Sequence, residues 1–386
     1  MINLTIFALT SLQSFGHSSA FSGYQSIRML SCGFSNHFTP ILYSDFVKHY
    51  IVKGSKFSNV LNSAIILDAE EDKVYKKTLV DSGGSSRVEI KRCLFLKCTS
   101  SGEGGGIKIG NDNSETSFLI SSTGFSQCKA SVGDAFYSQT KDLSISSSCI
   151  DTSLNNAFYA KEKSLISLSQ TTVSNSKLNV NMICLRAEIS RINVSGSINQ
   201  IKIKAAAENL VITNSNFGQN SGETMLIFET PGSREILFHS CNFIQNRYEY
   251  LVSFQGAMCR FAECSLMSDQ SSKYSREGNG FVMANCKFSE SEVEVKNRIP
   301  LQGDYSGCTF NTQITINNDM GQTYQCWDKM SSDNSSSKSK AASITVSVIF
   351  VGIVIAVLVV GIVYFGKRRC KSSKLGDQIP LFYTGL

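Results

Sequence analysis

One apolar position recurs along most of this chain, and its spacing limits the available folds more than any other feature. Successive occurrences lie 21 to 30 residues apart, with one interval of 38, and the intervals cluster at 22 and 23. A period of this length is typical of solenoids, in which every repeat forms one coil. We call the twelve positions anchors: Phe34, Phe57, Phe95, Phe125, Ile150, Val173, Val194, Phe217, Phe243, Leu266, Phe288 and Phe310.

Other residue types keep fixed offsets from each anchor. An apolar residue lies five positions before it, another lies seven before it from the third repeat on, and the residue two before is small, usually Cys, Ser or Thr, with Ile192 as the exception. The alternation changes phase between its two halves, which indicates two short strands joined by a tight turn. A third apolar pair often follows, as in Ile107 with Ile109, Met225 with Ile227, Val293 with Val295, and Ile314 with Ile316.

Three short strands per repeat predict an all-β fold, a parallel β-helix of about twelve coils. The composition agrees, because 42% of the residues are apolar, 18% are charged and only four are proline. Leucine-rich repeats need a Leu and Asn pattern that is absent here, and a β-sandwich would not keep one register through twelve repeats. We place the β-helix in residues 21–330, with a charged insert at about 63–86 looping out of it.

The C-terminal region has the pattern of a membrane anchor. Residues 344–365 are 22 residues without a charge, and as a helix they would be about 33 Å long, enough to cross a hydrocarbon core of about 30 Å. Basic residues follow directly, so the positive-inside rule places residues 366–386 in the cytoplasm. Residues 331–343 are interpreted as a Ser-rich stalk, and residues 1–20 as a candidate signal peptide without a basic start. Together they predict a single transmembrane α-helix in a plasma-membrane protein whose β-helix lies outside.

Short motifs within the repeats resemble those of the polymorphic membrane proteins, a family of right-handed β-helix surface proteins. Gly104-Gly105-Gly106-Ile107 is similar to the family's GGA[IL] motif, with Gly133-Asp134-Ala135-Phe136 as a degenerate second copy, and residues 217–220 and 243–246 match its FxxN motif. The C-terminal membrane helix with a short tail is similar to the arrangement in surface proteins of trichomonad-type parasitic protists. The resemblance implies a right-handed parallel β-helix and adhesion to a host or another surface.

The sequence gives little support for catalysis. Glycan cleavage needs carboxylates set several ångströms apart on one face, but the acidic residues that share a register are single and spread over several coils: Asp142, Asp151, Glu188, Glu208 and Glu235. The four histidines have no metal spacing, and no GxSxG motif is present. We therefore expect no enzyme activity and no cofactor. The net charge of +6 does not indicate nucleic-acid binding either, because residues 367–377 contribute +4 of it.

The thirteen cysteines require an explanation in a chain predicted to be exported. Cys241, Cys264, Cys286 and Cys308 occupy one inward position of four consecutive coils, which favours a buried ladder of thiols, with disulfides between adjacent coils as the alternative. Cys98 and Cys128 share the position three after the anchor and are the best disulfide candidates.

Several residues are candidates for modification or sorting. Asn193 and Asn334 begin glycosylation tripeptides. Cys370, just after the apolar run, is a palmitoylation candidate. Tyr383 and Leu386 fit the tyrosine motif that endocytic adaptors bind, which makes an adaptor a candidate partner of the tail.

The leading hypothesis is a non-enzymatic type I surface protein that contacts a host cell, matrix or glycan through a β-helical rod. The alternatives are a membrane-tethered polysaccharide lyase or glycoside hydrolase of the β-helix class, and a structural coat protein without a ligand.

Overall fold

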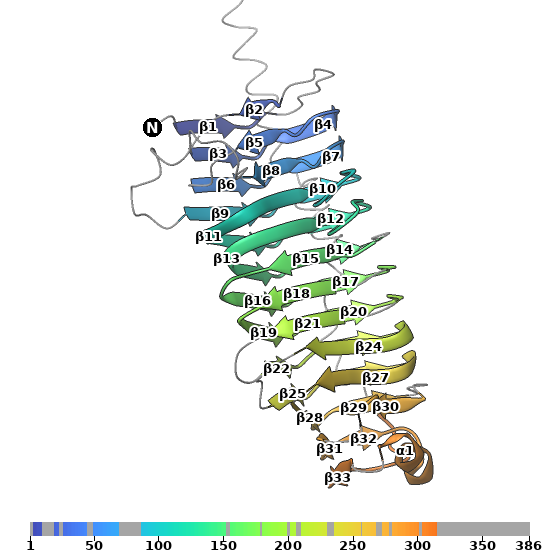
Figure 1. The fold of residues 1–386 in the computed structure, drawn as a ribbon. Helices are drawn as coiled ribbons and strands as arrows, with labels where there is room; N and C mark the ends of the chain where they lie inside the picture. Colours follow the sequence, from blue (N-terminus) through green and yellow to red (C-terminus); the bar gives the residue numbers. More distant parts are fainter. Residues whose placement is uncertain are drawn as a thin grey trace, which may run out of the picture. The chain divides into compact units, whose positions relative to one another are not determined.

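Each repeat forms one coil of a parallel β-solenoid, and the computed structural model has about ten such coils (Figure 1). The structure describes residues 3–9, 19–22, 26–44, 49–68, 86–151, 155–177, 180–198, 201–205, 210–229, 235–255, 257–267, 272–277, 280–300 and 303–314. Every pairing between strands in the described residues is parallel, from β1 with β3 to β31 with β33. The all-β parallel β-helix predicted from the anchors is therefore confirmed.

A coil contains three strands, which we name first, second and third in chain order. The first strands are β1 (Asn3–Phe7), β3 (Ser26–Leu30), β6 (His49–Lys53), β9 (Ser86–Lys91), the end of β11 (Ile107–Ser121), the end of β13 (Phe136–Ser146), β16 (Leu165–Ser169), β19 (Arg186–Ser190), β22 (Leu210–Thr213), β25 (Glu235–His239), β28 (Met258–Ala262), β31 (Phe281–Ala284) and β33 (Asp304–Ser306).

The second strands carry the anchors and form an 11-stranded sheet of their own. They are β4 (Gly33–His37), β7 (Lys56–Val60), β10 (Leu94–Leu96), β12 (Gly124–Ser126), β14 (Cys149–Asp151), β17 (Thr172–Ser174), β20 (Asn193–Ser195), β23 (Asn216–Gly218), β26 (Asn242–Ile244), β29 (Ser265–Met267) and β32 (Lys287–Phe288). The third strands join the first strands in a 22-stranded sheet. They are β2 (Phe21–Ser22), β5 (Leu42–Ser44), β8 (Ile65–Asp68), the starts of β11 and β13, β15 (Phe158–Lys161), β18 (Val180–Cys184), β21 (Ile201–Ala205), β24 (Ser221–Glu229), β27 (Arg247–Gln255) and β30 (Lys273–Ser275).

The corner before each anchor is made by one residue in the left-handed backbone region. It lies three positions before the anchor, with φ between 48° and 63°, and only two of the twelve examples are glycine: Ser31, Gly54, Arg92, Ser122, Ser147, Gln170, Arg191, Asn214, Ser240, Glu263, Asn285 and Gly307. For a residue with a Cβ atom, this backbone conformation is less favourable by about 1–2 kcal/mol. The stacked coils hold it there, so a search for glycine would miss most corners.

The small residue two before the anchor supplies hydrogen bonds to this corner. The Ser148 hydroxyl donates to the carbonyl of Ser146 at 2.9 Å and accepts from the backbone N–H of Thr123 at 3.2 Å. The Cys264 thiol makes the equivalent contact with the Ala262 carbonyl at 3.4 Å. Cys, Ser and Thr therefore recur here because each is small and each donates a hydrogen bond.

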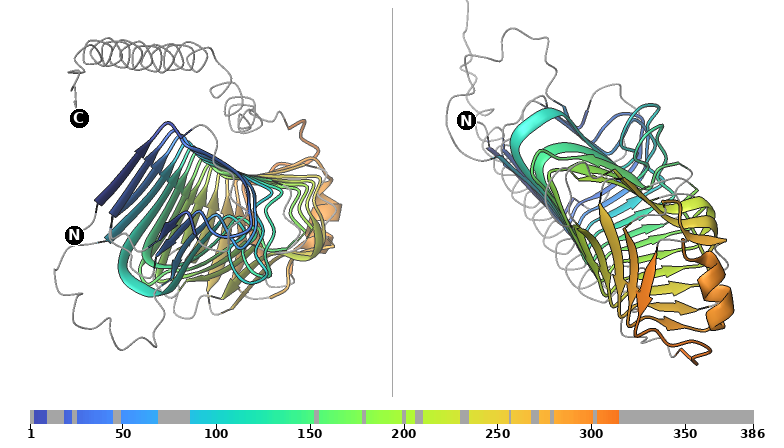
Figure 2. Two further views of the ribbon diagram at one scale, coloured as in Figure 1. Left: turned by 90° about the horizontal axis from the view of Figure 1, so that it is seen from above. Right: turned by 60° about the horizontal axis from the view of Figure 1, so that its bottom comes forward.

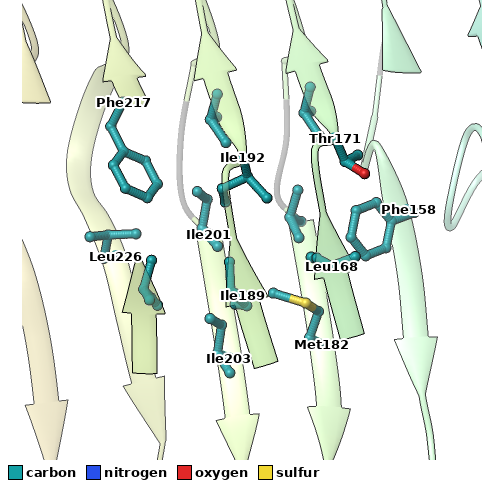
Figure 3. A pocket seen from close by; sticks show the side chains of 14 residues that line it. Phe158, Leu168, Thr171, Met182, Ile189, Ile192, Ile201, Ile203, Phe217 and Leu226 are labelled. Atoms are coloured by element: carbon teal, nitrogen blue, oxygen red, sulfur yellow. The ribbon is translucent and has the colours of Figure 1, made fainter. Parts of the chain in front are cut away.

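The anchors fill the core, and all of them from Phe34 to Phe288 are buried. Four successive phenylalanines stack nearly parallel, with ring centroids 5.3 Å apart for Phe34 and Phe57, 4.8 Å for Phe57 and Phe95, and 4.9 Å for Phe95 and Phe125. The next three anchors are aliphatic, and the core around the last two, Val173 and Val194, contains an apolar cavity of about 20 Å³ (Figure 3).

The end of the solenoid differs from the expected twelve coils. Helix α1 (Glu292–Arg298) replaces the third strand after β32, and Phe310 follows an isolated bridge in place of a strand (Figures 1 and 2). Ser291 caps α1 and forms a capping box with Glu294, a Ser-x-x-Glu signal that is visible in the sequence. Val295 is fully buried but Val293 is 69% exposed, so these two valines are not a strand pair.

Two other boundaries also shift. Residues 63–68, the start of the predicted insert, belong to the solenoid, since β8 pairs with both β5 and β11 and Ser63 and Ala64 bond to neighbouring coils. Residues 69–85 of the predicted insert lie outside the described residues. In β24 Met225 is buried as the sequence suggested, but the register then places Leu226 and Phe228 inward in place of Ile227. That strand is long enough to cross a corner, and the corner reverses the alternation.

The candidate signal peptide is partly described by the structure, whereas the predicted membrane helix is not. Asn3–Phe7, within the candidate signal peptide, pairs with β3 as one more first strand. Cleavage after residue 20 stays a prediction, and it would remove this strand. Among the residues that the structure describes, no helix is long and apolar enough to span a membrane. The predicted stalk, membrane helix and tail, residues 331–386, lie outside the described residues.

Candidate functional site

A groove of about 610 Å³ crosses the outward face of the first strands in five consecutive coils. The strands are β9, β11, β13, β16 and β19, which pair in that order. Its volume is within the range of ligand sites, about 300–1,000 Å³. We therefore take this groove as the candidate site.

The groove has a column of side chains along the stacking direction. Strand register aligns the first outward residue of each coil, in the order Arg87, Ser117, Asp142, Leu165 and Arg186. Four strand spacings separate the two arginines, which is about 19 Å. A second column lies two residues further on and contributes Leu119 and Ser144 to the lining.

Each end of the groove has an ion pair within one strand. The Arg87 guanidinium lies 3.6 Å from the Glu89 carboxylate, and that of Arg186 lies 2.6 Å from the Glu188 carboxylate. The side chains of both arginines are more than half exposed, so these pairs add little to stability. The guanidinium N–H groups remain accessible to a ligand.

A buried carboxyl group lies at the corner of one of these coils. One Glu162 oxygen accepts hydrogen bonds from the backbone N–H of Thr140, at 2.6 Å, and from the Thr140 hydroxyl, at 2.5 Å. Glu162 is 4% exposed, and its burial raises the pKa of the carboxyl group. The Thr140 hydroxyl also lies 3.2 Å from the carbonyl oxygen of Asp142. Glu162 thus supports the backbone that places Asp142 in the groove.

The acidic residues considered for catalysis do not gather at one place. Asp142 lines the groove, whereas Asp151 accepts hydrogen bonds from Ser174 and Asn175 on the second strands. Glu188 pairs with Arg186, and Glu208 lies outside the described residues. The part of the chain that the structure describes holds no group of three His, Cys, Asp or Glu residues suited to a metal ion.

The predicted cysteine ladder lies where the offsets place it. Cys241, Cys264 and Cys286 are fully buried and Cys308 is partly buried, and all four are free thiols. Burial is the main cause that raises the pKa of Cys264, whereas hydrogen bonds from the thiols of Cys264 and Cys308 lower that of Cys286. Zinc would need a convergent set of ligands, and these thiols are aligned along one direction.

The disulfide candidates Cys98 and Cys128 are also buried free thiols in the structure, so their bridge stays a prediction. Burial is the largest cause that raises the pKa of Cys98, and the neighbouring thiol of Cys128 adds to it. Cys149, which the sequence did not single out, is disulfide-bonded.

The FxxN motif has a structural explanation. Its asparagine lies three after the anchor and donates a hydrogen bond to the carbonyl of the preceding coil's anchor, at 2.9 Å from Asn220 to Val194 and at 2.9 Å from Asn246 to Phe217. Cys98 and Cys128 occupy the same position and donate to the carbonyls of Phe57 and Phe95, both at 3.7 Å. The asparagine of the motif is therefore one side chain that can bond at this corner, and the thiol of cysteine is another. Asn246 lies in the corner that follows β26.

The glycine motif packs the core beneath an anchor ring. A Cβ atom on Gly106 would lie 2.7 Å from the Ala135 carbonyl oxygen and 3.2 Å from the Phe125 ring. Backbone hydrogen bonds align Gly106 with Ala64, Ala135 and Ala157 in neighbouring coils. Residues 62–65 and 155–158 are thus further copies, which could have been found from an alanine followed by an apolar residue.

Some of the remaining candidate residues lie within the described part of the chain, and the others lie outside it. Asn193 lies in β20 and is only 6% exposed, which leaves little room for a glycan, and its glycosylation stays a prediction. Asn334, Cys370, Tyr383 and Leu386 lie outside the described residues. His239 and Asn242 point outward: His239 lies 4.0 Å from Glu263, and Asn242 donates to Asn216.

No protein family model matches this sequence, and no curated protein matches it. The resemblance to the polymorphic membrane proteins, with the right-handed coil that it implies, therefore stays a prediction.

Proposed function

We propose that this chain is a non-enzymatic type I cell-surface protein that makes adhesive contacts through the groove on its solenoid. The observation that carries the proposal is the groove itself, in which strand register sets the spacing of the outward side chains over five coils. A scaffold of stacked coils is rigid and presents long surfaces, which suits contact with another cell, a matrix or a glycan. The apolar run at 344–365 and the basic residues after it support the membrane anchor.

Carboxylate spacing favours binding over cleavage. A glycosidase places two carboxyl groups about 5–10 Å apart. In the groove lining that the structure describes, Asp142 is the one carboxylate. Strand geometry places Glu89 and Glu188 about 12 Å from it, each two coils away, and both are held in ion pairs. Glu115 is nearer, one coil away, but it lies outside the lining and pairs with Lys141.

Display of the full chain on cultured cells tests the proposal. We expect surface labelling of the solenoid on intact cells, attachment of these cells to host-cell or matrix layers, and weaker attachment for Asp142→Ala. Release of reducing ends from a polysaccharide panel would instead support the enzyme alternative. A chain that stays inside the cell, or cells that attach no better than untransfected ones, would refute the adhesive role.

A further inference from the structure

The groove runs across the strands, and this limits what can recognise a ligand there. Its floor is made of central strands whose backbone groups bond to the coils on both sides, as β13 does with β11 and β16. A peptide therefore has no strand edge to extend. Recognition must come from side chains, namely hydroxyl groups, aliphatic surface, one carboxylate and two guanidinium groups.

Hydroxyl groups and leucines both line the groove. Ser117, Ser144 and Ser164 supply groups that both donate and accept hydrogen bonds, which matches the hydroxyls of a sugar. Leu119, Leu165 and Leu185 supply apolar surface beside them, and Leu185 is 49% exposed. A chain of pyranose rings presents hydroxyl edges and C–H faces at short intervals, so it can use both kinds of group.

The charges argue against a polyanion. Arg87 and Arg186 are the two cations of the groove lining, and Lys53 also pairs with Glu89. These three cations are balanced by Asp142, Glu89 and Glu188, so the groove has no net positive charge. Asp142 lies midway between the arginines, where it would repel an acidic polymer. The same carboxylate is well placed to accept hydrogen bonds from neighbouring sugar hydroxyls.

We propose that the groove binds an uncharged linear oligosaccharide that lies along the stacking direction, with its centre at Asp142 and its ends at Arg87 and Arg186. This inference rests on the proposed contact function and names the ligand class for it.

Binding of oligosaccharides to the detergent-solubilised full chain tests the inference. The probes are uncharged linear hexasaccharides of glucose, N-acetylglucosamine, mannose and galactose, with the corresponding disaccharides and a galacturonate hexasaccharide for comparison. We expect at least one uncharged hexasaccharide to bind, its disaccharide to bind at least tenfold more weakly, and the galacturonate hexasaccharide not to bind. The affinity should change less than about twofold between 50 mM and 500 mM salt, since screening acts on charge pairs.

Matched variants assign the binding to the groove. Asp142→Ala should weaken binding about tenfold to a hundredfold, the loss expected for hydrogen bonds to a charged group. Glu235 lies in the same column two coils beyond Arg186, so Glu235→Gln is a control that should leave the affinity unchanged. An unchanged circular dichroism spectrum shows that each variant is folded.

The failures of the two proposals are distinguishable. If no uncharged hexasaccharide binds, or if galacturonate binds more tightly, the ligand class is wrong. Loss of cell attachment in Asp142→Ala would then still support the groove as a contact surface for another ligand. If Glu235→Gln weakens oligosaccharide binding as much as Asp142→Ala, the groove is not the site.

Discussion

The coils anchored by phenylalanine and the coils anchored by aliphatic residues share one register but fill their cores differently. Phe57, Phe95 and Phe125 stack with ring centroids less than 5 Å apart. Ile150, Val173 and Val194 occupy the same inward position, but the cavity of about 20 Å³ lies among the last two of them and their neighbours (Figure 3). Backbone pairing therefore sets the period, whereas side-chain volume decides how well each coil is packed.

The largest effect should come from removing one stacked ring. Phe95→Ala is expected to cost about 3–5 kcal/mol of unfolding free energy, because Phe95 is fully buried between two parallel rings. Val173→Ala removes only two carbon atoms, and its expected cost is about 1–2 kcal/mol. Urea unfolding of the full chain, followed by circular dichroism, measures both, and equal losses would contradict the difference between the two regions.

The corner after the anchor also differs between the two regions. There the carbonyl of the preceding coil's anchor accepts a hydrogen bond from cysteine among the phenylalanine coils and from asparagine further along. Asn246→Ala should cost about 1–3 kcal/mol, because it leaves the Asn220 N–H and the Phe217 carbonyl without their partner. Cys128→Ala should cost less, since the thiol is a weak donor at 3.7 Å. A larger loss for Cys128→Ala in the same urea experiment would reverse this ranking.

The coils around the cavity also hold the buried carboxyl group of Glu162. Its pKa is raised in the folded protein, so the folded state keeps a proton that the unfolded chain releases above pH 4.5. Stability should therefore fall as the pH rises from 4.5 through the raised value. Glu162→Gln removes this loss and should stabilise the protein at neutral pH, because the amide carries no charge to bury. Urea unfolding at pH 4 and pH 8 tests this, and a gain that is equal at both pH values would contradict it.

The repeat could be predicted from the sequence because inward residues must be apolar at fixed offsets, and the eleven buried anchors from Phe34 to Phe288 confirm it. The corners carried no such signal, since the stacked coils hold residues such as Arg92 and Glu263 at positive φ. The column of the groove could have been found from the same offsets, because Arg87, Asp142 and Arg186 each lie eight residues before an anchor. Asp142 was noticed as an acid, but the arginines were not considered with it. The hollow itself could not be predicted, because it depends on the conformations of the outward side chains.

The smallest effect should come from filling the cavity. This change tests side-chain packing alone, because the strand register is the same in both regions. Val173→Ile adds one carbon beside the cavity and should stabilise the protein by up to about 1 kcal/mol. The matched change Val52→Ile adds the same carbon at a buried position among the phenylalanine coils, where extra volume must displace neighbours. Urea unfolding should then show a gain for the first variant and no change or a loss for the second. A gain at both positions would mean that the phenylalanine coils are packed no more tightly than the aliphatic ones, because a filled core leaves no space that an added methyl group can occupy without strain.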